Sequence, residues 1–277
     1  MSLRHFAAPR LRHSLLVTSL LLAGSFSAHA AEEMLRKAVG KGAYEMAYSQ
    51  QENALWVATS QSRSLDKGGV VYRLDPTTLD VTQIIHNDLK PFGATINHAT
   101  GTLCTGTGAM ATGLAIDPQA KRLYTTNADG ELLTIDSESN TIASRKKLQD
   151  DGKAHFYLNL SLDTAGHRAF ITDSKQPEVL VVDTRDGKVL EKIATPESLA
   201  VLFNPARNEA YVTHRKAGEV SVIDGKSYKV VKTFKTPTHP NSLALSEDGK
   251  TLYVSVKQAS SREKEATAPD DVIRIAL

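Results

Sequence analysis

The chain has 277 residues, 41% of them hydrophobic and 23% charged, so it can bury a sizeable core and is neither disordered nor collagen-like. Its one cysteine, Cys104, excludes an intrachain disulfide framework and any metal centre built from several cysteines. The formal charge of +2 becomes −1 (30 basic against 31 acidic residues) once Arg4, Arg10 and Arg12 are set aside, so no global positive field attracts nucleic acid.

Residues 1–30 have the features of a secretory signal peptide. The three arginines form a positive amino-terminal region, and the apolar run 15–23 is shorter than the roughly 20 residues that span a bilayer. Ala28-His29-Ala30 matches an A-x-A cleavage site, so we expect Sec-type export and cleavage after Ala30; the alternative is an uncleaved anchor helix. In a Gram-negative host, residues 31–277 would be a single periplasmic domain, monomeric and not inserted in the membrane.

A β pattern then recurs about every forty residues. Each unit has an apolar alternation, a turn, a run with an aromatic residue, a run that ends in aspartate, and a fourth run. The aromatic residues are Trp56, Tyr124, Phe170, Tyr211 and Tyr253, and from Tyr124 onward they are spaced by 46, 41 and 42 residues. Four short strands per forty residues, bounded by Gly, Pro, Asn or Asp, are typical of a propeller blade. We therefore predict an all-β fold, a β-propeller of four-stranded antiparallel blades.

Two recurring residue types are assigned structural roles because they repeat at equivalent positions. The aspartates that follow the third run are Asp75, Asp136, Asp183 and Asp224. We expect them to begin the turn into the fourth strand by accepting hydrogen bonds from the backbone that follows. The aromatic residues of the second strands are expected to pack between blades.

The two ends of the pattern complement each other. The last unit stops at Asp271–Leu277, which supplies only a third strand, and Met34–Val39 precedes the first unit. We expect Met34–Val39 to be the missing fourth strand, so that the amino- and carboxy-terminal strands close the ring and remove exposed sheet edges.

The pattern is interrupted between residues 93 and 112. Two strands begin a unit, but the junction near residues 104–110 leads directly into the first strand of the next unit. This leaves five complete repeats and a stub. Either a smaller ring closes, or the junction leaves a gap with exposed apolar edges. Cys104, within the stub, is expected to be a buried, inert thiol; the alternative is a reactive one.

These repeats, with stretches such as 36–47 and 198–206, resemble the YVTN-type β-propeller family, which includes a periplasmic seven-bladed member. The resemblance covers residues 31–103 and 110–277 and departs from the family at 104–109, where about two repeats are absent. It implies a non-enzymatic binding protein with single-stranded DNA as its ligand. It does not assign the DNA contacts to individual residues.

The binding residues are therefore predicted from the geometry of a propeller. Loops from fourth to first strands and from second to third strands gather on one face around the channel. Bases stack on aromatic rings for about 1–3 kcal/mol each, while cations contact phosphates. The candidates on these loops are Phe92, Asn127, His155, Phe156, Tyr157, Lys175, His214, Arg215, Lys216, His239, Asn241 and Lys257. Acidic residues share the loops, so the alternative is an ordinary solvated rim.

Enzymatic motifs are absent from the sequence. Gly106-Thr107-Gly108 is not followed by a Walker Lys-Ser/Thr pair, and there is no G-x-S-x-G nucleophile elbow. We therefore expect no catalytic residue, no metal site and no cofactor. Two alternatives stay open. One is a periplasmic protein-interaction scaffold that uses the rigid face or a flexible loop at 258–269. The other is a lactonase-like hydrolase, with a metal held by channel carboxylates such as Asp129 and Asp173 or by channel-face histidines.

Overall fold

The computed structural model describes residues 34–61, 68–87, 95–97, 102–104, 111–137, 141–237, 239–259 and 268–277. The predicted signal peptide, the junction 105–110 and residues 260–267 of the predicted loop lie outside these ranges. All regular structure in the described ranges is β-strand, in five four-stranded antiparallel sheets and one two-stranded hairpin. No helix that is long and apolar enough to span a membrane occurs in them.

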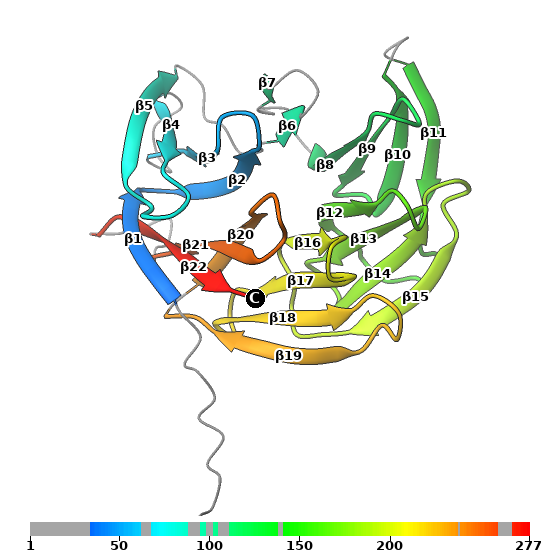
Figure 1. Cartoon of the computed structure of the whole chain (residues 1–277). Helices are drawn as coiled ribbons and strands as arrows, with labels where there is room; N and C mark the ends of the chain where they lie inside the picture. Colours follow the sequence, from blue (N-terminus) through cyan, green and yellow to red (C-terminus); the bar gives the residue numbers. More distant parts are fainter. Residues whose placement is uncertain are drawn as a thin grey trace, which may run out of the picture. The chain divides into compact units, whose positions relative to one another are not determined.

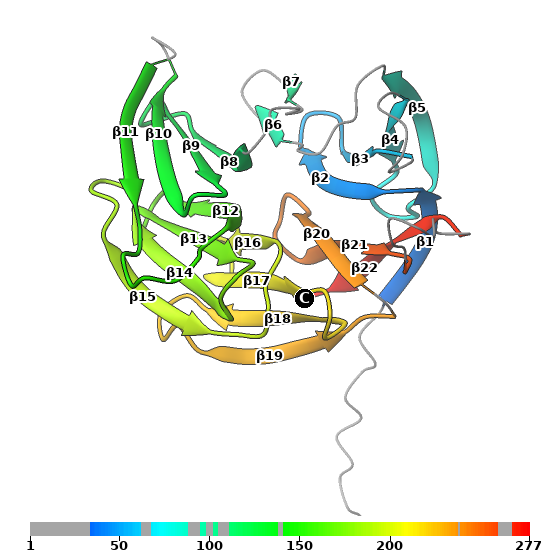
Figure 2. The same ribbon diagram turned by 180° about the vertical axis from the view of Figure 1, so that it is seen from behind.

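The five sheets are the blades of a propeller, and each has one edge strand innermost (Figures 1 and 2). Blade 1 consists of β2 (Ala43–Ser49), β3 (Ala54–Thr59), β4 (Gly69–Leu74) and β5 (Val81–Asn87). Blade 2 consists of β8 (Ala111–Asp117), β9 (Arg122–Asn127), β10 (Glu131–Asp136) and β11 (Thr141–Lys147). Blade 3 consists of β12 (Tyr157–Asp163), β13 (Arg168–Asp173), β14 (Glu178–Asp183) and β15 (Val189–Ala194).

Blade 4 consists of β16 (Val201–Asn204), β17 (Glu209–His214), β18 (Glu219–Asp224) and β19 (Val230–Lys235). Blade 5 consists of β20 (His239–Leu245), β21 (Thr251–Lys257), β22 (Asp270–Ala276) and β1 (Met34–Gly40). The hairpin consists of β6 (Thr95–Asn97) and β7 (Thr102–Cys104). The predicted all-β propeller, with five complete repeats and a stub, is confirmed.

Blade 5 is completed by the two ends of the pattern. Strand β1 pairs antiparallel with β22, in a register that places Met34 opposite Ile275 and Ala38 opposite Asp271. An ion pair between Arg36 and Asp271 joins the same two strands. The predicted pairing of the amino- and carboxy-terminal strands within one blade is therefore confirmed.

The aspartates at the ends of third strands behave as predicted in three blades. Oδ1 of Asp75 accepts hydrogen bonds from the backbone N–H groups of Thr77 and Thr78, both at 2.8 Å. Asp183 and Asp224 accept equivalent bonds from the residues that follow them. Asp136 instead forms an ion pair with Arg122, and the turn after it, 138–140, lies outside the described residues.

A hydroxyl two residues after the aromatic of the second strand recurs in four blades. Thr126, Thr172, Thr213 and Ser255 carry it, and blade 1 has Ala58 instead. Each hydroxyl accepts a hydrogen bond from a backbone N–H of the first strand or of the residue just before it. The donors are Gly113 (3.2 Å), Asn159 (3.1 Å), Ala200 (3.0 Å) and Ser242 (2.9 Å). In blades 2, 3 and 5 this N–H lies at a register shift between the first and second strands, where the ladder is interrupted, and the hydroxyl satisfies it.

Two of these hydroxyls also connect neighbouring blades. Thr172 donates to the carbonyl oxygen of Leu199, in the segment that enters blade 4, at 2.8 Å. Thr213 donates to the carbonyl oxygen of Asn241 in blade 5 at 3.2 Å. One side chain thus satisfies a backbone donor in its own blade and a backbone acceptor in the next.

Replacement of Thr172 by valine keeps the shape of the side chain and removes both hydrogen bonds. A buried donor and a buried acceptor then lose their partner, so the free energy of unfolding should fall by about 1–3 kcal/mol. Urea denaturation of Thr172→Val against Thr233→Val, on the exposed outer strand β19, measures the difference. Equal midpoints for the two variants would contradict the role of the hydroxyl.

Four of the five blades also pack one apolar side chain of their inner strand against the preceding blade. The position is opposite the residue that follows the aromatic, and its occupants are Met46, Leu160, Val201 and Leu243 in blades 1, 3, 4 and 5. These side chains are 3–6% exposed and lie in clusters shared with the preceding blade. Around Leu160 the packing is so close that a Cβ on Gly113 of blade 2 would lie 2.7 Å from Cδ2 of Leu160.

In blade 2 the equivalent residue is Leu114, opposite Thr125, and it is 43% exposed. The preceding element is the β6–β7 hairpin, which lies between β2 and β8 (Figure 1). Strand β6 contacts β2 of blade 1, and the two inner strands β2 and β8 do not pack on each other as other neighbouring inner strands do. Of the two alternatives for the shortened ring, the described residues therefore show the gap with an exposed apolar edge.

Leucine-to-alanine substitutions should distinguish the open junction from a closed one. Leu160→Ala should lower the free energy of unfolding by about 2–5 kcal/mol, because it leaves a cavity between blades 2 and 3. Leu114→Ala should cost less than about 1 kcal/mol, because that side chain is already largely exposed. Guanidinium denaturation of the two variants provides the comparison, and a large cost at both sites would show that Leu114 is covered in solution.

Candidate functional site

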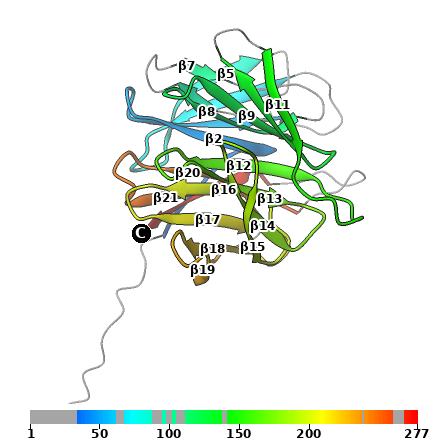
Figure 3. The same cartoon turned by 90° about the vertical axis from the view of Figure 1, so that its right-hand side faces the viewer.

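The predicted site residues gather at one end of the blades. First strands begin and second strands end there, as shown by the pairing of Tyr157 with Asp173 and of His239 with Lys257. We call this end the loop face; in the edge-on view of Figure 3 the turns lie at the two ends of the blades. All the predicted site residues except Phe92, which lies outside the described residues, are on strands or connections at this end.

Their exposure divides them into three groups. Lys175 and Lys216 are exposed. Asn127, Phe156, Arg215 and His239 are half-buried. His155, Tyr157, His214, Asn241 and Lys257 are buried. Tyr157 and His214 have no exposed surface, so the expectation that they contact a ligand is corrected: both support the loops from within.

His214 shows how such support works. Its Nε2 lies 2.9 Å from Oγ of Ser221, and its Nδ1 lies 3.2 Å from the carbonyl oxygen of Glu197. Burial lowers the pKa of His214, which favours the neutral imidazole. The ring therefore fixes the connection into blade 4 and adds no positive charge to the surface.

Lys257 is also a supporting residue. Its side chain is buried, and its Nζ lies 3.6 Å from the centroid of the Tyr44 ring, a cation–π contact. Nδ2 of Asn241 donates to the carbonyl oxygen of Tyr44 at 2.7 Å. Both contacts hold Tyr44, a half-buried aromatic residue at the start of β2. The sequence analysis missed Tyr44 because none of its candidates came from the connection that enters blade 1.

The remaining polar residues hold the connections of the loop face. Nδ2 of Asn127 donates to Oε2 of Glu131 at 2.7 Å, within the hairpin of blade 2. Nδ1 of His239 lies 3.1 Å from the carbonyl oxygen of Arg215, which links blade 5 to blade 4. Lys216 forms an exposed ion pair with Glu197, at 2.6 Å. Exposed pairs of this kind contribute about 0–1 kcal/mol, so Lys216 can exchange this partner for another anion at little cost.

His155 lies in a cluster of acidic residues at the base of the loop face. Its Nδ1 is 2.7 Å from Oδ2 of Asp173, and its Nε2 is 2.9 Å from Oδ1 of Asp151. Burial alone would lower the pKa of His155, but the two carboxylates raise it overall. Phe156 follows directly, and its backbone N–H donates to Asp173 at 3.2 Å. The cluster thus fixes the backbone at Phe156, a half-buried residue of the loop face.

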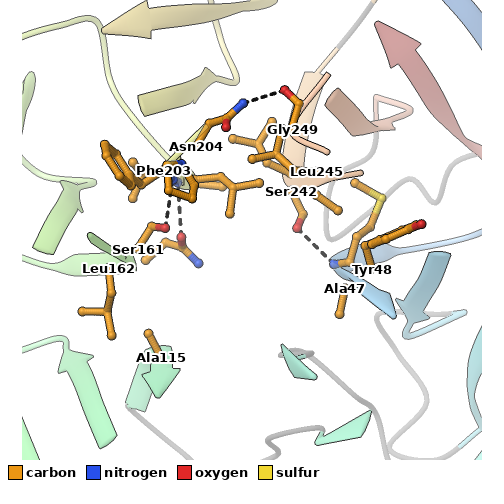
Figure 4. Close-up of a pocket in the computed structure, with 18 of the residues that line it drawn as sticks. Ala47, Tyr48, Ala115, Ser161, Leu162, Phe203, Asn204, Ser242, Leu245 and Gly249 are labelled. Atoms are coloured by element: carbon orange, nitrogen blue, oxygen red, sulfur yellow. Dashed lines mark hydrogen bonds between the residues drawn. The ribbon is translucent and has the colours of Figure 1, made fainter. Parts of the chain in front are cut away.

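A second feature, the central channel, contains a cavity of about 430 Å³. It is lined by the inner strands of all five blades and by turns between first and second strands, so it extends toward the end opposite the loop face. Figure 4 shows Ala115, Leu162, Phe203 and Leu245 around it. No predicted site residue lines this cavity, which the sequence analysis did not identify.

One carboxyl group of this cavity belongs to Glu45. Oγ of Ser242 donates to its Oε2 at 3.0 Å, and Oγ of the same serine accepts from the backbone N–H of Met46 at 3.1 Å. Burial raises the pKa of Glu45 to about 7. The channel therefore carries an acidic group that changes charge near neutral pH.

This pKa predicts a specific pH dependence of stability. Between about pH 4.5 and 7 the folded protein keeps a proton on Glu45 that the unfolded chain has lost, so the free energy of unfolding falls as the pH rises through that range. Glu45→Gln removes this pH dependence. The free energy of unfolding of the variant, relative to that of the wild type, should therefore be about 1–3 kcal/mol higher at pH 8 than at pH 5. Chemical denaturation at both pH values, with exposed Glu247→Gln as the control, tests it; parallel pH profiles would contradict the assignment.

The five four-stranded blades with a loop-lined end define the chain as a β-propeller. Solved structures agree at the level of the fold. A chain of a nidogen/laminin complex is 17% identical with a TM-score of 0.58, over 74% of this chain and 85% of that one. The Cps50 (Swd1) β-propeller domain of Myceliophteria thermophila is 10% identical with a TM-score of 0.62, over 89% of this chain and 100% of that domain.

Sequence comparisons identify one family among the many proteins with this fold. The sequence model of the YncE-like β-propeller family matches residues 22–275, and the chain belongs to this family. Two proteins named "Uncharacterized protein YncE" are similar over the full length of both chains. The protein of Salmonella typhimurium (strain LT2) is 62% identical, and that of Escherichia coli (strain K12) is 61% identical.

The alignments with these relatives also show how many residues this chain lacks by comparison. Each alignment runs over 353 positions, whereas this chain has 277 residues, so at least 76 positions (353 less 277) hold no residue of this chain. That deficit approaches the length of two repeats. It agrees with the interruption found in the sequence and with the open junction before blade 2.

Proposed function

We propose that this protein is a non-enzymatic, periplasmic binding protein that takes single-stranded DNA on its loop face. The observation that carries the proposal is the combination, at that end of the blades, of cations on blades 3 and 4 with half-buried aromatic residues at the starts of blades 3 and 1. The likeness to YVTN-type propellers supports the same ligand, and the secretory signal predicted from residues 1–30 supports the location.

The cations are contributed by the loops between second and third strands. Lys175 extends from blade 3, and Arg215 and Lys216 from blade 4. Lys175 and Lys216 are exposed, and Arg215 is half-buried. The two blades are neighbours, because Oγ of Ser198 donates to the carbonyl oxygen of Glu178 at 3.3 Å. Cations on adjacent loops suit an extended anion such as a phosphodiester backbone.

The rings are contributed by the starts of first strands. Phe156 precedes blade 3 and Tyr44 begins blade 1, and both residues are half-buried. Asp173 accepts a hydrogen bond from the backbone N–H of Phe156, and Nζ of Lys257 lies over the ring of Tyr44. Rings fixed in this way lose little conformational freedom when a base stacks on them.

The near-zero charge of residues 31–277 shapes the expected binding. Without a global positive field, affinity depends on a few local cations, so we expect weak binding with a shallow salt dependence. Each phosphate contact contributes about 0.7 to the slope of log K against log salt for a single strand. Three cations therefore predict a slope near −2.

The test is a fluorescence-anisotropy titration of the protein with labelled single-stranded oligonucleotides at 20 and 150 mM salt. The double variant Lys175→Ala/Lys216→Ala should bind about tenfold or more weakly and should lower the salt slope by about 1–1.5, because two phosphate contacts are lost. Absence of binding by the folded wild type at the lower salt would end the DNA proposal and favour the protein-interaction scaffold.

The matched control is Lys226→Ala/Lys250→Ala, which removes two exposed lysines from turns at the opposite end of the blades. Its affinity should equal that of the wild type. The opposite change, Glu197→Gln, releases Lys216 from its ion pair and should strengthen binding. A control that weakens binding as much as the test variant would show a non-specific charge effect and not a loop-face site.

A further inference from the structure

The acidic cluster around His155 contains the donor set of a metal site. One ligand atom each from His155, Asp173 and Glu178 lies within 4.8 Å of the others. The side chains of His155 and Asp173 are 2% and 0% exposed. They are held by two segments, the connection from β11 to β12 and the loop from β13 to β14, so the cluster is built into the fold and is not a surface accident.

The secondary contacts orient these groups as in known metal sites. A metal-binding histidine generally gives its other ring N–H to a carboxylate. Here Nε2 of His155 faces Oδ1 of Asp151 at 2.9 Å, which leaves Nδ1 directed into the cluster. Oδ1 of Asp173 accepts backbone N–H bonds from Phe156, Lys175 and Gln176, so Oδ2 is the oxygen directed into the cluster.

Gln149 provides an independent observation. It is 5% exposed, and its Nε2 donates to Oε1 of Glu178 at 2.7 Å. Its Oε1 is buried and has no hydrogen-bond partner among the described residues. An unsatisfied buried oxygen is costly. Rotation of the amide by 180° would direct Oε1 toward Nδ1 of His155 and the carboxylate of Glu178, where a bound cation would be a favourable partner for an oxygen.

Comparison of the blades shows that a positive charge is missing here. Glu131 in blade 2 and Glu219 in blade 4 occupy the position of Glu178 at the start of the third strand. The residues opposite them on the fourth strand are Lys147 and Lys235, and Glu131 and Glu219 are ion-paired with Arg145 and Lys235. Opposite Glu178 stands Ala194. No arginine or lysine pairs with Glu178 in the described part of the chain.

We propose that this cluster binds a divalent transition-metal cation of the zinc type, with His155, Asp173, Glu178 and Gln149 as its ligands. One imidazole nitrogen and three oxygens suit Zn²⁺ better than Ca²⁺ or Mg²⁺, which prefer oxygen alone. Ligands of a tetrahedral ion at about 2.0–2.2 Å stand about 3.4 Å apart. The ion therefore replaces the contact between Nδ1 and Oδ2 and occupies the place of the proton that now joins them.

The experiment uses the full chain, stripped with a chelator, and Zn²⁺ alone as the probe. Isothermal titration calorimetry and elemental analysis of the dialysed protein should give one zinc per chain, and Zn²⁺ should raise the melting temperature. Glu178→Gln should weaken binding about tenfold or more. Glu219→Gln, the same change one blade further on, should leave it unaltered.

A second variant, Ala194→Lys, supplies the cation that the neighbouring blades already have. Ala194 is exposed on an outer strand, so the substitution leaves the core intact. It should weaken zinc binding at least tenfold without loss of thermal stability in the metal-free protein. Absence of zinc binding by the wild type would overturn the proposal. Equal binding by the wild type, Glu178→Gln and Ala194→Lys would overturn it as well, since the ion would then lie elsewhere.

Discussion

The structure depends on contact between blades. A four-stranded sheet with two apolar faces cannot bury both of them alone, so each blade needs a neighbour on either side. Leu160, Val201 and Leu243 pack against the preceding blade, and the hydroxyls of Thr172 and Thr213 join backbone groups of consecutive blades. Where this contact is interrupted, at Leu114, the molecule exposes an apolar surface. The loop face is organised only as far as these junctions hold the blades in register.

Much of the fold was predictable because it repeats. An aromatic residue about every forty positions identified the five blades, and the third strand at the carboxy-terminal end predicted its pairing with Met34–Val39, which the register of β1 with β22 confirms. The open junction could not be decided from sequence, because a missing repeat shows only as an interruption. Whether neighbouring sheets can close over it depends on distances between Leu114 and elements far away in the sequence.

The site was less predictable than the fold. Sequence position alone placed the predicted residues other than Phe92 at the loop face, but it could not distinguish exposed Lys175 from buried Lys257, since both are lysines near the ends of second strands. The ring of Tyr44 beside Lys257 decides that difference. Likewise, Gln149 and Glu178 lie 29 residues apart with no motif between them, and only the docking of two loops brings them to His155.

The pairing of β1 with β22 has a consequence for how the chain is made. Strand β1 is synthesised before its partner at 270–276, which follows more than 200 residues later. At about 5–20 residues per second this delay lasts tens of seconds at the slow end. Throughout that time β1 has no partner strand, because blade 5 cannot assemble until residues 270–276 have been added to the chain. Blades 1 to 4 each consist of strands that are consecutive in sequence, whereas blade 5 joins strands from both ends of the described chain and therefore cannot form as early as the others.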